Sequence, residues 1–163
     1  MSSMVQTPFS EATFRQACGQ FATGVAVATA CGPAGEPHGL TINSFTSVSL
    51  APPLVLICID YRAQVLQVFL RASQFAVNIL RDSQQEISNR FAYRVEDRFC
   101  EVSWKPGQTG APILDGALAS IECVTRQVID AGDHTILLGE AVAVHAGGGD
   151  PLLYFNSKYH RIG

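Results

Sequence analysis

The two longest extended segments of the chain, residues 117–129 and 134–145, are separated by only four residues, Asp130-Ala131-Gly132-Asp133. Glycine and aspartate are typical turn residues, and so short a connection favours antiparallel neighbours. Shorter extended segments precede them, mostly joined by short turns, and cover residues 24–31, 38–45, 44–50, 54–59 and 75–80. This pattern predicts a mainly β fold, an antiparallel sheet or barrel with a few helices packed outside it.

Three segments have the apolar spacing of a helix. The first begins at a capping Ser10 and extends to about Phe21, and the second covers residues 63–72. The third is expected to open with a capping box at Ser83 and to end near Ala92. No strand is followed by G-x-G-x-x-G and no G-x-x-x-x-G-K-[ST] occurs, so a bound nucleotide must be held without either common phosphate loop.

The length of 163 residues fits one domain, which we place at residues 1–163 with its core at about 10–163. Its least regular part, residues 93–116, is expected to run over the surface as a long loop. Charged residues make up 15% of the chain, well below the usual ~25%. So low a fraction suggests a subunit interface or a bound flat ligand. The net charge of −3 offers no basic face of the kind that nucleic-acid binding needs.

The sequence contains no pattern typical of a membrane span or a metal site. No apolar run approaches the ~18 residues of a membrane helix, and residues 1–10 lack the charge and the apolar stretch of a signal peptide. The five cysteines are scattered without a C-x-x-C pair, and the four histidines have no ligand spacing. We therefore expect reduced thiols in a cytoplasmic protein that binds no metal, nucleic acid or membrane.

Six of the nine residues 41–49 carry a hydroxyl or amide side chain, although strongly apolar strands flank them. Two interpretations are open. Short neutral donors beside turning backbone can bind a phosphate or a polyol without net charge. Alternatively, the segment is a bulged strand edge whose hydroxyls bond to local backbone.

The Gly132-Asp133-His134 sequence between the two longest segments also has two interpretations. Glycine and aspartate make it a hairpin turn, beside which a histidine is most often simply exposed. The same histidine is also a candidate catalytic side chain, because imidazole changes its charge close to neutral pH.

The chain resembles the short-chain flavin reductase family in several strings that occur in the family's order. They are residues 21–25 (FATGV), Gly39-Leu40-Thr41, residues 44–56 (SFTSVSLAPPLVL), 75–80 (FAVNIL), Gly132-Asp133-His134, 139–142 (GEAV) and 151–154 (PLLY). The resemblance covers residues 14–162, nearly the whole chain. It implies an FMN-binding split β-barrel of the Greek-key type with peripheral helices, usually a homodimer that holds FMN or FAD near the subunit interface.

The resemblance also implies that NADH or NADPH reduces the flavin, which then leaves for a separate oxygenase, as in two-component flavin monooxygenases. Residues matching the family's flavin contacts would hold the ribityl chain, the phosphate and the ring edge; they are Thr41, Asn43, Ser44, Ser47, Val48 and Ser49. His134, in the turn with Gly132 and Asp133, would lie at the nicotinamide side of the ring. Tyr159 would help to close that pocket.

The chain departs from the family pattern after its apolar strand, at Asp60-Tyr61-Arg62-Ala63-Gln64. Family members often have a hydroxyl-bearing turn there that meets the phosphate, whereas Ala63 has no hydroxyl. We expect a helix to start at Ala63 and Gln64, and we expect its backbone N–H groups, together with Arg62, to bind the phosphate instead. The rival hypotheses are a flavin- or haem-binding barrel without turnover and a plain dimerisation module. The sequence leaves FMN versus FAD, and NADH versus NADPH, open.

Overall fold

The computed structural model describes residues 7–93 and 95–163 of the chain. Most of residues 1–10, the segment predicted to carry no signal peptide, therefore lies outside the described part. The fold is built on a seven-stranded antiparallel sheet with the strand order β3-β2-β6-β9-β10-β5-β4. Its strands are β2 (Ala26–Cys31), β3 (Pro37–Ile42), β4 (Thr46–Leu50), β5 (Pro53–Asp60), β6 (Gln74–Ile79), β9 (Ala119–Ala131) and β10 (His134–Ala146).

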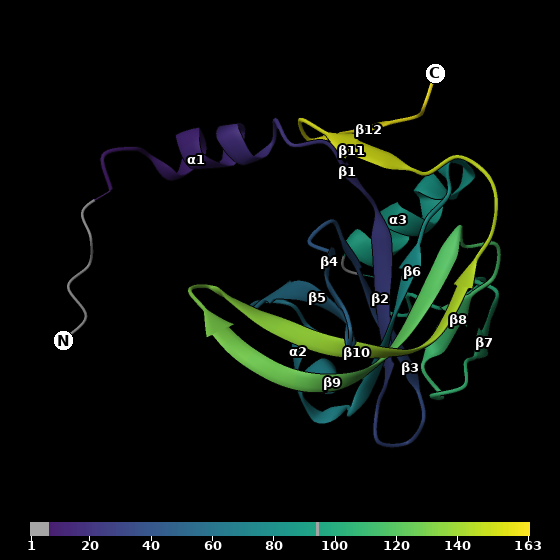
Figure 1. Cartoon of the computed structure of the whole chain (residues 1–163). Helices are drawn as coiled ribbons and strands as arrows, with labels where there is room; N and C mark the ends of the chain where they lie inside the picture. Colours follow the sequence, from purple (N-terminus) through teal and green to yellow (C-terminus); the bar gives the residue numbers. More distant parts are fainter. Residues whose placement is uncertain (1–6, 94) are drawn as a thin grey trace.

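The sheet closes on itself because its two edge strands are consecutive in the chain. β3 and β4 lie at opposite ends of the strand order, yet only residues 43–45 connect them. Four residue steps of extended chain reach about 14 Å, so the two edges must come together, and Figure 1 shows the strands wrapped round one another. The described residues of β3 and β4 form no ladder with each other, so the barrel has a seam at residues 43–45. The prediction of a mainly β barrel is confirmed.

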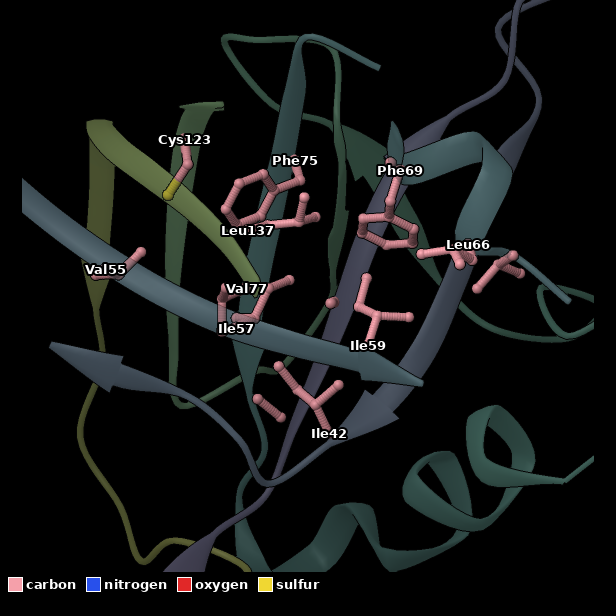
Figure 2. Packing of buried hydrophobic residues seen from close by; sticks show 14 residues of the cluster. Ile42, Val55, Ile57, Ile59, Leu66, Phe69, Phe75, Val77, Cys123 and Leu137 are labelled. Atoms are coloured by element: carbon pink, nitrogen blue, oxygen red, sulfur yellow. The ribbon is translucent and has the colours of Figure 1, made fainter. Parts of the chain in front are cut away.

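The barrel core lies between the inner sheet face and helix α2 (Leu66–Arg71), as Figure 2 shows. Val55, Ile57 and Ile59 of β5 point into it and are at most 6% exposed. The intervening residues of β5 are only half-buried. The run 54–59 is apolar at every position, which alone would predict burial on both faces, but only its inward-facing residues are fully buried.

A second apolar cluster lies around helix α3 (Gln85–Ala92) and a small sheet of β1 (Thr23–Gly24), β11 (Leu153–Phe155) and β12 (Lys158–His160). Helix α3 follows a 3₁₀ turn, η1 (Asp82–Gln84). The capping contact forms at Arg81, whose N–H donates to the side chain of Gln84, and not at Ser83 as predicted. The expected loop 93–116 contains a short hairpin of β7 (Trp104–Pro106) and β8 (Pro112–Leu114).

Helix α1 (Glu11–Cys18) stands apart from the barrel in Figure 1. Its predicted cap is confirmed, because the Ser10 hydroxyl accepts from the N–H of Thr13. The helix ends at Cys18 rather than Phe21, and none of its residues is buried. Within the described residues, none of the helices is long and apolar enough to cross a membrane.

Candidate functional site

Two hydroxyls of the polar segment 41–49 are used inside the protein. The Ser44 hydroxyl donates to the carbonyl of Cys58 at 3.0 Å and accepts from the N–H of Cys58 at 3.1 Å, which ties the seam to β5. The Thr41 hydroxyl donates to the carbonyl of Ser88 in α3 at 2.6 Å. These partners lie 47 and 14 residues away in the chain, so the two hydroxyls bond neither to local backbone nor to a ligand: they tie the segment to α3 and to β5.

The rest of the segment presents an open polar edge. Asn43, Ser47 and Val48 are exposed and Ser49 is half-buried. The register between β4 and β5 shifts between Ser47 and Ser49, which makes Val48 a bulged residue. Because β4 pairs only with β5, the backbone groups on its other edge are not in a ladder of the described chain. Bulges of this kind are frequent beside active sites, where they redirect side chains.

A cavity of about 140 Å³ opens beside this edge, at the ends of β1, β2, β3 and β6. Asn43 and Phe45 line it from the seam, and Thr23 and Gly24 line it from β1. The Thr23 hydroxyl is buried and has no hydrogen-bond partner among the described residues. Such a group costs free energy unless something satisfies it. Sequence reasoning assigned Thr23 no role, because its spacing from the polar segment does not reveal their proximity.

The turn after β5 holds Arg62 in an ion pair. The Nη2 of Arg62 lies 2.7 Å from the Oδ2 of Asp60, and this guanidinium holds the pKa of Asp60 well below its usual range. The side chain of Arg62 is nevertheless 79% exposed and faces solvent. An incoming phosphate would therefore compete with the carboxylate of Asp60 for the guanidinium.

The expected helix start at Ala63 is wrong. The N–H of Ala63 donates to the carbonyl of Asp60 at 2.9 Å, so it is already used in a turn. Helix α2 begins at Leu66, and its N-cap position is occupied by Val65, which has no side-chain capping group. Gln64 is exposed between the turn and the helix.

The Gly132-Asp133 turn joins β9 to β10 as predicted, and Gly132 has a φ of +67°. Positive φ at the first central position of a two-residue hairpin favours glycine. His134 pairs with Asp60 of β5 on one side and with Ala131 of β9 on the other. The Nδ1 of His134 lies 2.7 Å from the Oδ1 of Asp133, and this contact lowers the pKa of Asp133.

The structure brings the seam and this turn to the same end of β5. Ser44 is bonded to Cys58, and two residues further along β5 Asp60 pairs with His134. Two residues of a strand extend about 6.6 Å, so the seam at Ser44, the Arg62 turn and His134 surround one region. Ser47 and Ser49 pair with Val55 and Leu54, so the open edge of β4 runs from this region towards the other end of β5.

Tyr159 lies against helix α3 and the small sheet rather than beside His134. Its hydroxyl is 2.7 Å from the Oγ of Ser88, and its ring packs edge-on against Tyr154. Ser88 is also the residue that accepts from Thr41. In the contacts of the described residues, Tyr159 therefore joins Thr41 at α3, and it makes none with the Gly132–His134 turn.

The donors at this end of β5 suit a neutral polyol and a phosphate better than a metal. They are the exposed amide of Asn43 and the guanidinium of Arg62, with the hydroxyls of the β4 edge leading away from them and the unsatisfied hydroxyl of Thr23 on the cavity that Asn43 lines. Within residues 7–93 and 95–163, the acidic, histidine and cysteine side chains form no group of three that could hold a metal ion. The residues present fit a flavin mononucleotide unit.

Comparison with known proteins supports this fit. The family model described as "Flavin reductase like domain" matches residues 18–163. The chain belongs to the flavin reductase-like family. The resemblance stated from the sequence and the split-barrel fold that it implies are therefore confirmed.

Three relatives illustrate the match. The "Flavin reductase (NADH)" of Kitasatospora aureofaciens is 45% identical over 156 residues, covering 91% of this chain and 80% of that protein. The "Flavin-dependent trigonelline monooxygenase, reductase component" of Acinetobacter baylyi is 43% identical over 145 residues, covering 89% of this chain and 47% of that protein. A solved structure of the Streptomyces globisporus NADH:FAD oxidoreductase with NAD and FAD fragments has a TM-score of 0.90 and 37% identity, covering 99% and 98% of the two chains.

The chain spans only part of several curated relatives. It covers about half of the Acinetobacter protein and of a "Probable flavin reductase" from Rhizobium meliloti. A flavin reductase-like domain is therefore common to proteins of quite different length.

Proposed function

We propose that this protein is an NAD(P)H-dependent flavin reductase, which transfers a hydride from NADH or NADPH to FMN or FAD. The observation that carries the proposal is the meeting of the polar seam, the Arg62 turn and His134 at one end of β5. Family membership and the names of relatives that reduce flavin with NADH support it. The domain that does this work comprises residues 10–163.

The flavin would lie along the open edge of β4. Asn43, Ser47 and Ser49 with the bulged backbone at Val48 would bind its ribityl chain and ring edge. Arg62 would face the phosphate, with the exposed side chain of Gln64 beside it, whereas the N–H of Ala63 is already bonded to Asp60. Thr41 and Ser44, whose hydroxyls are bonded internally, would contribute by holding the backbone of the seam.

His134 would meet the nicotinamide. The carboxylate of Asp133 fixes its Nδ1 as a proton donor, which leaves Nε2 for the substrate side. A ring held in this way can orient a carboxamide or hold a proton at Nε2. Bound flavin supplies the two-electron acceptor, and the protein supplies orientation and exclusion of water. Tyr159 would help to close the pocket through its fixed position beside Ser88.

A homodimer is part of the proposal. Helix α1 has eight residues and buries none of them, although isolated helices below about 12–15 residues are marginal in water. Large apolar side chains stand exposed at three places: Phe21 after α1 is 78% exposed, Leu50 of β4 94% and Val144 of β10 74%. A second copy would cover them. Analytical ultracentrifugation should give a molecular mass of twice 17.5 kDa. The double variant Phe14→Glu/Phe21→Glu should shift that mass towards the monomer.

A separate oxygenase is the proposed recipient of the reduced flavin. Several relatives are named as reductase components or subunits of flavin-dependent monooxygenases. All five cysteines are free in the structure, which supports a reducing, cytoplasmic location.

The proposal is tested by steady-state kinetics with both flavins and both nicotinamides. We expect NADH or NADPH oxidation that requires added FMN or FAD and saturates with each. Tight flavin binding with no nicotinamide oxidation would instead favour a binding protein without turnover. A protein that neither binds flavin nor oxidises the nicotinamide would favour the third hypothesis, a dimerisation module.

A further inference from the structure

Tyr61, the first residue after β5, ties the hairpin turn that carries His134 to the rest of the sheet. Its N–H donates to the carbonyl of Asp133 at 3.0 Å, and its hydroxyl donates to the Oδ1 of Asp130 at 2.7 Å. Because β10 lies between β5 and β9 in the sheet, the side chain of Tyr61 reaches across the start of β10 to β9. One residue therefore holds the hairpin at the end of β9 and at the turn itself.

Packing does not hold the turn in place. A side chain at Gly132 would meet nothing within 4 Å, and Asp133 is exposed. Hairpin tips without buried contacts open at little cost in free energy. The sheet pairs His134 with Asp60 and Ala131 at the base of the turn. The two hydrogen bonds of Tyr61 add a restraint there, next to the carboxylate that orients His134.

We propose that Tyr61 is a positioning residue for the reductase reaction, because its bonds to Asp130 and Asp133 fix the turn that presents His134 to the nicotinamide. This inference rests on the proposed function. Tyr61 acts through His134 and performs no chemistry itself. The carboxylate of Asp130 raises the pKa of Tyr61, so the phenol keeps its proton and the hydroxyl bond persists throughout the neutral range.

The test is a set of three single variants and one double variant. Tyr61→Phe and Asp130→Ala each remove the hydroxyl bond, and each should raise the KM for NADH at least threefold while kcat and the flavin Kd change less than twofold. Asp130→Asn keeps an acceptor oxygen and should restore a KM near that of the wild type. The double variant Tyr61→Phe/Asp130→Ala should be no worse than either single variant, because one bond is lost in all of them.

Amide hydrogen exchange provides a readout that does not depend on activity. Exchange at residues 131–134 should be faster in Tyr61→Phe than in the wild type. It should be unchanged in the matched control Tyr93→Phe, because Tyr93 is 67% exposed. Wild-type KM and exchange in Tyr61→Phe, or additive effects in the double variant, would overturn the role of Tyr61. A wild-type protein that oxidises no NADH would overturn the proposed function, and the exchange data would still show whether Tyr61 holds the turn.

Discussion

Replacing Ser44 with alanine should destabilise the barrel seam without changing the surface that unfolding exposes. The Ser44 hydroxyl makes two hydrogen bonds with Cys58: it accepts from the N–H of Cys58 and donates to the carbonyl of Cys58. Both groups of Cys58 would face the seam without a protein partner. Each hydrogen bond contributes a net stability of about 0.5–1.5 kcal/mol. Because water reaches this half-buried edge and offsets part of the loss, we expect the free energy of unfolding to fall by about 1–2 kcal/mol for the pair.

Guanidinium unfolding followed by circular dichroism measures this loss. We expect a lower midpoint with an unchanged slope, and a Tm lower by about 2–8 °C for a chain of this size. Ser47→Ala is the matched control, because Ser47 is exposed on the same segment and should stay within about 0.5 kcal/mol of the wild type. In flavin titration the order of the two variants should reverse. Ser47→Ala should weaken flavin binding more than Ser44→Ala does, because it directly removes a proposed contact. A Ser44→Ala protein as stable as the wild type would refute the assignment of Ser44 to the seam.

Four further predictions concern other residues. His134→Ala should keep the flavin Kd within about threefold but lower kcat/KM for NADH about ten- to a hundredfold, or 1.4–2.7 kcal/mol; wild-type NADH kinetics would contradict it. Glu122→Ala should cost about 3 kcal/mol in guanidinium unfolding, because the buried carboxylate accepts from the N–H groups of Gln108 and Thr109 and from the Thr109 hydroxyl; a loss below about 1 kcal/mol would count against that clamp. Of the five thiols, the exposed Cys18 and Cys100 should react first with a thiol reagent, whereas burial raises the pKa of Cys123 from 9.0 to about 12. The folded state therefore keeps the Cys123 proton longer than the unfolded state does, and stability should fall as pH rises from about 9 towards 12, with a shallower slope in Cys123→Ala.

The strands were predictable because their signals are local. The hairpin of β9 and β10 with its Gly-Asp turn was visible as two long extended segments round four turn residues. The apolar period of α1 was visible too, but period alone does not say what covers a helix, and the barrel does not cover this one. The start of α2 was missed because Ala63 and Gln64 have helical propensity but no capping side chain fixes the first turn there.

The candidate site was predictable only in part, because it depends on contacts between distant segments. The polar segment and His134 were identified as separate features, and their meeting depends on the register of β5 with β10. That Ser44 bonds to Cys58 while Ser47 stays exposed follows from the seam, which no spacing in the sequence reveals. Thr23 and Tyr61 were missed for the same reason, since each acts on a segment far away in the chain.

An anaerobic single-turnover experiment tests the central claim most directly. The protein is mixed with one equivalent of FMN or FAD and one of NADH, and the visible absorption of the oxidised flavin is followed together with the absorption of NADH. We predict that both decay at the same rate and in equal amounts, faster than without protein, and more slowly with His134→Ala. Loss of NADH without loss of flavin absorption, or rates no greater than those without protein, would contradict hydride transfer at this site.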